Sequence, residues 1–192
     1  VCLASPLRDV YKRQIVKGDQ NHLTFAVKRD VTTEHEGEVS TILHDEYQEG
    51  DNINLTAPVG PFHVVEKSNK QLFLGSGIGV TPLVSMFNEV VNDNGEARFI
   101  QVTNDTNDAP FSSLLTSIAN KNAQATYDLH DKNKNGYIGR EQLKQWIDDD
   151  TEIYVCGGKS FIQSMIKSLK ELNVDESKIH YETFIPKLSV AV

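Results

Sequence analysis

The strongest chemical signal in the chain is a glycine-rich run at residues 75–82 (GSGIGVTP). It follows a short apolar stretch and precedes a segment with helical spacing, which is the setting that a dinucleotide fingerprint requires. Glycines let the backbone approach a pyrophosphate, and the free amides at a helix start attract its charge. Val80 stands where the usual fingerprint has its third glycine, so an ordinary glycine-rich turn of an α/β protein is the alternative interpretation.

A second turn of the same kind lies at residues 154–161 (YVCGGKSF), where an apolar strand runs through two glycines into a helix start. Ligands of doubly wound sheets bind at the carboxyl ends of the strands, so two such turns can face one cofactor. Cys156 is most simply a small buried hydrophobe. No neighbouring His or Lys side chain indicates a lowered pKa, so we do not expect this cysteine to be a nucleophile.

Two further segments carry candidate chemistry. The C-terminal run 179–186 (IHYETFIP) places a carboxylate between aromatic residues at the end of a strand, where it could approach a planar ring. The alternative is an ordinary final strand with one exposed Glu. Residues 131–138 (DKNKNGYI) resemble the start of a calcium loop, but Gln142 stands where that loop needs a bidentate Glu. We therefore predict a solvated loop there, with a strand before it and a helix after it, and no metal site.

The elements that must position these residues form two groups. Up to about residue 69 the pattern is antiparallel β with one short helix, which opens at residue 37. Beyond it strands alternate with helices, which predicts a parallel sheet covered by helices on both faces. The expected strands are 71–74, 99–102, 123–129, 153–156 and 179–184, and the expected helices are 81–91, 111–119, 139–147 and 160–172. Asn173 can close the last helix in a left-handed cap.

Composition narrows the class of protein. The chain has 192 residues and a formal net charge of -8, which disfavours nucleic acid or an anionic membrane as the main partner. No apolar run approaches the roughly 20 residues of a membrane span. The two cysteines cannot form a disulfide framework or hold an iron–sulfur cluster. A reduced, cytoplasmic protein is expected.

Residues 1–14 (VCLASPLRDVYKRQ) do not fit the rest of the chain. They are basic in an acidic protein and show no strand or helix period. Residues 9–14 resemble the translation of an adapter used in sequencing libraries, so we interpret 1–14 as a non-native scar. A disordered natural N-terminus is the alternative.

Taken in order, these segments resemble the C-terminal reductase region of flavohemoglobins, within the ferredoxin–NADP reductase-like superfamily. The resemblance extends over residues 15–186, and its segments are 37–40 with 43–44, 50–51, 57–62, 75–82, 155–157 and 180–184. It implies the C-terminal part of a truncated antiparallel FAD-binding β-barrel at 15–69. A doubly wound, NAD(P)H-binding α/β domain at 70–186 and a tail at 187–192 would follow.

The resemblance also implies roles for individual residues. The nicotinamide cofactor would be cradled by Gly77, Ile78, Gly79, Val80, Thr81 and Pro82. Its nicotinamide side would be met by Cys156 and Gly157. The FAD phosphates would lie at a helix start formed by Gly37, Val39 and Ser40. The flavin would lie against Thr183, Phe184, Ile185 and Pro186. Glu182 would sit near the flavin–haem junction and tune electron transfer. Ile185 and Gly158 depart from the family, which usually has Gly and Pro there.

The implied activity is that of an FAD-dependent NAD(P)H oxidoreductase. It would pass electrons from nicotinamide through flavin to haem in a nitric oxide dioxygenase, with the haem in a globin domain that the given chain lacks. One alternative is a flavin reductase that feeds an iron–sulfur protein or a hydroxylase, and another is a nucleotide-binding module without redox activity. Asp105 follows the second strand with no Arg nearby, and an acid there favours NADH over NADPH. Asp105 could instead simply cap a turn.

Overall fold

The computed structural model describes residues 27, 29, 38–54, 61–65 and 70–183. In the first part, α1 (Glu38–Asp45) confirms the predicted short helix, and the backbone turns at Gly50 (φ 99°). Residues 46–54 and 61–65 contain no strand, and most of the predicted barrel segment 15–69 lies outside the described residues.

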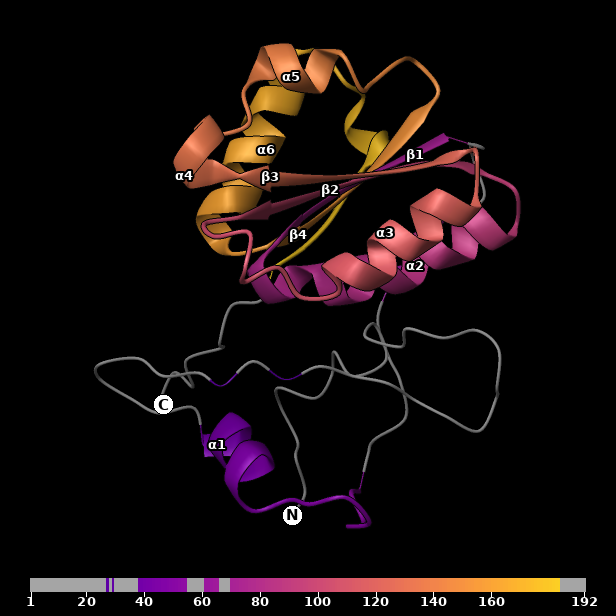
Figure 1. Ribbon diagram of the computed structural model, residues 1–192. Coiled ribbons are helices and arrows are strands. Elements are labelled where there is room, and N and C mark those ends of the chain that lie inside the picture. The colour runs from indigo at the N-terminus through magenta and orange to yellow at the C-terminus, as the bar shows by residue number, and fades with distance from the viewer. Residues whose placement is uncertain (1–26, 28, 30–37, 55–60, 66–69, 184–192) are drawn as a thin grey trace.

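Five parallel strands form the sheet of the second part, in the order β3-β2-β1-β4-β5. The strands are β1 (Lys70–Ser76), β2 (Glu96–Thr103), β3 (Ala125–Asp131), β4 (Thr151–Gly157) and β5 (Ile179–Thr183). The helices are α2 (Val80–Asn92), α3 (Ser112–Lys121), α4 (Lys132–Asn135), α5 (Arg140–Lys144) and α6 (Lys159–Glu171). Short 3₁₀ turns occur at Gly77–Gly79 and Glu176–Lys178. Figure 1 shows α2 and α3 below the sheet and α5 and α6 above it, as the alternating pattern predicted.

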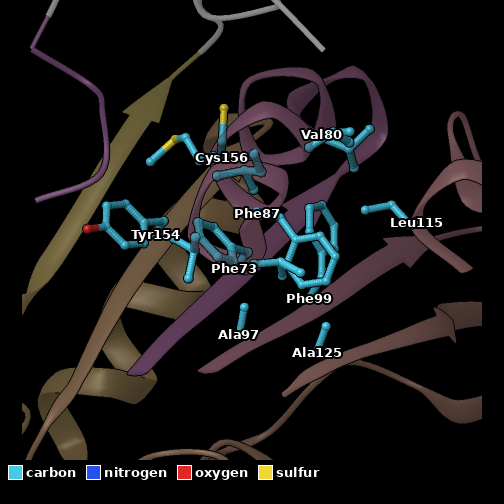
Figure 2. Close-up of a cluster of buried hydrophobic side chains, with 14 of the residues drawn as sticks. Phe73, Val80, Phe87, Ala97, Phe99, Leu115, Ala125, Tyr154 and Cys156 are labelled. Atoms are coloured by element: carbon cyan, nitrogen blue, oxygen red, sulfur yellow. The ribbon is translucent and has the colours of Figure 1, made fainter. Parts of the chain in front are cut away.

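Both faces of the central strands are apolar because helices cover both. Phe73 faces α2, whereas its neighbours Leu72 and Leu74 face α6. On the α2 face the rings of Phe73 and Tyr154 stack at 5.2 Å, and Phe87 from α2 meets Phe73 edge-on at 6.0 Å. Figure 2 shows this aromatic cluster. Each such ring contributes about 1.5–3 kcal/mol by leaving water, so this layer anchors the sheet.

Two element predictions need correction. The predicted helix at 139–147 is shorter, since α5 spans only Arg140–Lys144. The loop predicted after residue 131 contains a one-turn helix, α4, because the Asp131 carboxylate accepts hydrogen bonds from the backbone N–H groups of Asn133 and Lys134. The residue that opens the calcium-like pattern is thus a helix cap. A strand does precede it and a helix does follow it, as predicted, although with the bounds of β3 and α5.

The C-terminus of α6 confirms the predicted left-handed cap. Asn173 has φ 57°, its N–H bonds to the carbonyl of Lys170, and the N–H of Val174 bonds to the carbonyl of Leu169. This pair of bonds is the Schellman arrangement. Asn94 closes α2 in the same way, with φ 62°.

Substitutions at Asn173 test the backbone argument. Asn173→Ala should lower the free energy of unfolding by about 1 kcal/mol, because Ala keeps a Cβ at positive φ but lacks the polar side chain whose local hydrogen bonding lets Asn tolerate this conformation. Asn173→Gly should leave stability unchanged or slightly higher. Urea denaturation of the two variants measures the difference, and Asn94 should show the same ranking. Equal stabilities for the Ala and Gly variants would contradict the argument.

Candidate functional site

The sheet reverses its winding between β1 and β4. The chain leaves β1 for α2 on one face and leaves β4 for α6 on the other, while the two strands pair directly, with Gly75 opposite Cys156. In open α/β sheets such a switch point opens a crevice outside the carboxyl ends of the strands, where ligands bind. Both glycine turns found in the sequence end at this point.

The two turns touch through their backbones. A Cβ added to Gly79 would lie 2.5 Å from the Cα of Gly157 and 2.6 Å from its nitrogen. A Cβ on Gly157 would in turn meet the ring of Phe161 at 2.9 Å. Only glycine allows this approach, so the sequence requirement at both turns is steric.

Close strand–helix packing explains why Val80 replaces the third glycine of the usual fingerprint. Val80 is the first residue of α2 and is fully buried. A Cβ on Gly75 would lie 2.9 Å from Val80 Cγ1 and 3.1 Å from Leu83 Cδ1. The small residue that the packing needs is therefore on the strand, and the helix supplies the larger one.

Gly77 is the open position of the turn. It has φ 56°, which favours glycine, and no atom lies within 4 Å of where its Cβ would be. An exposed, side-chain-free backbone at the start of a 13-residue helix can admit a pyrophosphate. The described residues therefore fit the phosphate bridge of a dinucleotide.

The predicted cofactor-binding residues of this turn lie together but divide into two kinds. Gly77 is exposed and Ile78 is half-buried. Gly79, Val80, Thr81 and Pro82 are buried, and Thr81 Oγ1 donates to the carbonyl of Ile78 at 2.9 Å. This second group shapes the turn from inside the fold.

The turn after β4 places Cys156 and Gly157 at the switch point. The Cys156 side chain is 0% exposed and packs in the cluster on the α2 face, as its interpretation as a buried hydrophobe predicted. Gly158 caps α6 with φ -67° and ψ 155°. Because proline adopts the same φ, this glycine keeps the backbone conformation that a proline would impose.

The remaining predicted residues lie on other segments. Glu182, on β5, is half-buried and stands opposite Cys156 in the parallel register. Thr183 ends β5, and Val39 and Ser40 lie in the first turn of α1, both half-buried. Four predicted site residues lie outside the described part of the chain: Gly37, Phe184, Ile185 and Pro186. The roles assigned to all of these residues remain predictions.

Sequence analysis missed a buried polar group near the amino end of β4. Glu152 on β4 is 2% exposed, and its Oε2 lies 2.6 Å from His180 Nε2 on β5. The His180 ring stacks on Tyr154 at 4.9 Å, and the Tyr154 hydroxyl accepts the N–H of Val65 at 2.9 Å. Burial raises the pKa of Tyr154 to about 12. The alternation of residues 152, 154 and 156 on one face was the available signal, but their partners are distant in sequence.

The loop after β2 carries Asp105. Its Oδ1 accepts the N–H of Asn107 at 2.9 Å, so the carboxylate caps a turn. The side chain is also exposed, and its suggested contact with a ribose stays a prediction.

Two absences apply only to the described ranges. No helix there is long and apolar enough to cross a membrane. Within the same ranges, no group of three or more His, Cys, Asp or Glu side chains is arranged to hold a metal ion.

Comparison with known proteins places these features in a family context. The family model "Oxidoreductase NAD-binding domain" matches residues 73–167. Relatives include the flavohemoproteins of Bacillus subtilis (34% identical, covering 90% of this chain and 45% of that protein) and Rhodopirellula baltica (32%, 88% and 46%). The chain thus spans less than half the length of these curated relatives.

Solved structures give the same picture. The flavohem-like FAD/NAD binding domain of nitric oxide dioxygenase from Vibrio cholerae matches with a TM-score of 0.74 at 27% identity, over 82% of this chain and 69% of that one. Phthalate dioxygenase reductase matches with a TM-score of 0.67 at 20% identity, over 82% of this chain and 48% of that one. The latter similarity concerns the fold alone.

The contact between the two turns generates a direct test. Gly79→Ala should lower the free energy of unfolding by about 1–3 kcal/mol, because the new Cβ pushes the β1 and β4 turns apart. The same change should weaken NADH binding at the switch point. Urea denaturation and calorimetric titration measure the two effects.

Gly139→Ala is the matched control, since a Cβ at Gly139 would meet no atom within 4 Å and its φ is -104°. It should leave NADH binding unchanged and lower stability only by the preference of a helix N-cap for Gly over Ala, since Gly139 caps α5. If Gly79→Ala changed stability and NADH binding no more than this control does, the close contact would matter for neither.

Proposed function

Because the chain is a relative of the reductase region of flavohemoglobins, within the ferredoxin–NADP reductase-like superfamily, we propose that it transfers electrons from NAD(P)H through FAD to a haem. The observation that carries the proposal is the backbone contact of Gly79 with Gly157 at the switch point, beside the open backbone of Gly77. That arrangement suits a pyrophosphate bridge and places the rest of a dinucleotide along the carboxyl edge of the sheet.

Each group of residues has a separate task in this proposal. Gly77 and the start of α2 hold the phosphates, while buried Thr81 and Pro82 keep the turn in shape. Gly157 and Gly158 leave room for the nicotinamide ring above β4. Glu182, at the carboxyl end of β5, lies toward the flavin side and tunes its electrostatic environment. Bound FAD would supply the conversion of a two-electron hydride transfer into single-electron steps.

The segment 61–65 supports the joining of a flavin part to this domain. Phe62 is 8% exposed and meets the Tyr154 ring edge-on at 6.3 Å, and Val65 bonds to the same side chain. Residues that precede β1 are thus docked on the sheet beside α2. Such docking is what a flavin-binding part needs in order to face the nicotinamide.

Nitric oxide dioxygenation is the whole-protein activity that we propose, with the haem in a globin domain of the complete protein. Its support is the similarity to the flavohemoproteins and to the nitric oxide dioxygenase domain from Vibrio cholerae. A cytoplasmic location accompanies this proposal, since the reaction consumes reduced nicotinamide.

Flavin reduction tests the oxidoreductase activity. The full chain, supplied with excess FAD under anaerobic conditions, should bleach the absorbance of oxidised flavin when NADH is added, faster than free FAD does. Gly79→Ala should slow the reaction at limiting NADH. Bleaching no faster than that of free FAD would overturn the activity, and binding of NADH without bleaching would favour the module without redox activity.

Coenzyme preference is a separate prediction. Asp105 is exposed at the end of β2, and the nearby lysines are engaged: Lys134 pairs with Asp131 at 3.2 Å, and Lys132 lies 5.0 Å from the Tyr137 ring centre. We expect kcat/KM to be higher for NADH than for NADPH, because a carboxylate repels the 2′-phosphate. Asp105→Asn should narrow that ratio, whereas a ratio that does not respond would remove Asp105 from coenzyme recognition.

A further inference from the structure

Hydrogen bonds hold residues 104–111, the loop between β2 and α3, in one conformation. Some are formed within the loop, and others come from neighbouring elements. At the start of the loop, the hydroxyl of Thr103, the last residue of β2, donates to the carbonyl of Asp105 at 2.8 Å and to that of Asp108 at 3.1 Å. The N–H of Asp108 also bonds to the carbonyl of Asp105 at 3.0 Å. The loop begins at the same carboxyl edge as the glycine turn, one strand further from β4.

A neighbouring element fastens the first residue of the loop. Asn133, in α4, donates from Nδ2 to the carbonyl of Asn104 at 2.7 Å. Since α4 is itself capped by Asp131 at the end of β3, the loop after β2 is tied to the turn after β3.

A buried side-chain pair fastens the last part of the loop. Gln101, 1% exposed on β2, donates from Nε2 to the carbonyl of Pro110 at 3.0 Å. Its Oε1 accepts the hydroxyl of Tyr127, from β3, at 2.7 Å. A carbonyl can only accept, so the amide nitrogen must face Pro110 and the Tyr127 hydroxyl must be the donor. Burial raises the pKa of Tyr127 to about 12, so the hydroxyl remains a donor at neutral pH and well into the alkaline range.

The backbone at the end of the loop is strained. Phe111 has φ 64°, a left-handed conformation that bulky residues rarely adopt. Strain of this kind persists only where the surroundings enforce it. Here the carbonyl of Pro110 is held by Gln101, and the Phe111 side chain packs against the core on the α2 face. The loop is therefore preorganised.

We propose that Gln101 and Tyr127 are positioning residues that hold loop 104–111 in the shape that receives the adenosine half of the dinucleotide. The inference rests on the proposed function, because it takes the cofactor to lie along the carboxyl edge. Neither side chain touches the ligand. They act through Pro110 and Asp105, so their loss raises the cost of ordering the loop on binding.

Two probes separate the loop from the glycine turn. ADP-ribose carries the adenosine half and the phosphates, whereas inorganic pyrophosphate carries the phosphates alone. In the full chain, Tyr127→Phe should raise the dissociation constant of ADP-ribose by about fivefold, the effect of roughly one net hydrogen bond. The affinity for pyrophosphate should not change. Calorimetry or NMR titration measures both.

A second variant guards against loss of folding. Asn133→Ala removes the bond to Asn104 from an exposed position, so the core stays intact while the loop loses its other external bond. It should weaken ADP-ribose binding without affecting pyrophosphate. If both variants remain folded and bind ADP-ribose as tightly as the unmodified chain, the inference is wrong.

Tyr154→Phe is the matched control. It removes another tyrosine hydroxyl with a raised pKa, from a ring that is fully buried, and that hydroxyl bonds to Val65 on the other side of the sheet centre. Both tyrosine variants should lose stability in urea, and only Tyr127→Phe should lose ADP-ribose affinity. If Tyr154→Phe lost the same ADP-ribose affinity, general destabilisation would explain the loss in Tyr127→Phe, and the inference would be overturned.

The unmodified chain distinguishes the two proposals. Binding of pyrophosphate with no gain from adenosine would overturn the role of the loop and leave the phosphate site standing. Binding of neither probe would overturn the proposed function, and the inference with it.

Discussion

The contact between Gly79 and Gly157 is the constraint on which the rest of the structure depends. Two backbones meet at a distance that excludes any side chain, at the one place in the sheet where the winding reverses. This contact brings the ends of β1 and β4 together and leaves Gly77 on the open side. The buried side chains of Val80, Thr81 and Pro82, in the first turn of α2, then hold the glycine turn in place. The glycine pattern in the sequence therefore reflects the need for close backbone packing as much as the proposed ligand binding.

A layer of aromatic rings on the face of the sheet that α2 covers holds neighbouring strands together, as the glycine contact holds the two turns together. Phe73, Phe99 and Tyr154 lie side by side on three strands, and Phe87 closes the layer from α2. Tyr154 has a second task, because its hydroxyl takes a backbone N–H from Val65. One residue thus belongs both to the core of the sheet and to the docking of the preceding segment.

The elements from residue 70 onward could be predicted because each is marked by residues that lie close together in the sequence. Apolar spacing marked the five strands and α2, α3 and α6, and Asn173 marked the left-handed cap. The glycine turns also fell where they were expected, since a strand, a glycine turn and a helix start are adjacent in sequence. By contrast, α4 was missed because its stability comes from one capping carboxylate, Asp131, within a polar stretch.

Polar pairs could not be predicted, since their partners are far apart in the chain. Tyr127 and Gln101 are 26 residues apart, and His180 and Glu152 are 28 apart. Each side chain alone looks like an ordinary strand residue. Only the strand order, which places β3 beside β2 and β5 beside β4, makes them neighbours.

The pairing of β1 with β4 also has a consequence for the way the chain folds. Lys70 pairs with Thr151, so forming this contact closes a loop of about 80 residues, which carries a larger entropy cost than the neighbouring β1–β2 pairing. Long-range parallel pairing is slow for the same reason. The strands β1, β2 and β3, with α2 and α3, can associate first through shorter loops. On this entropic argument we expect the contact of Gly157 with Gly79 to form after those shorter-range contacts, when β4 docks.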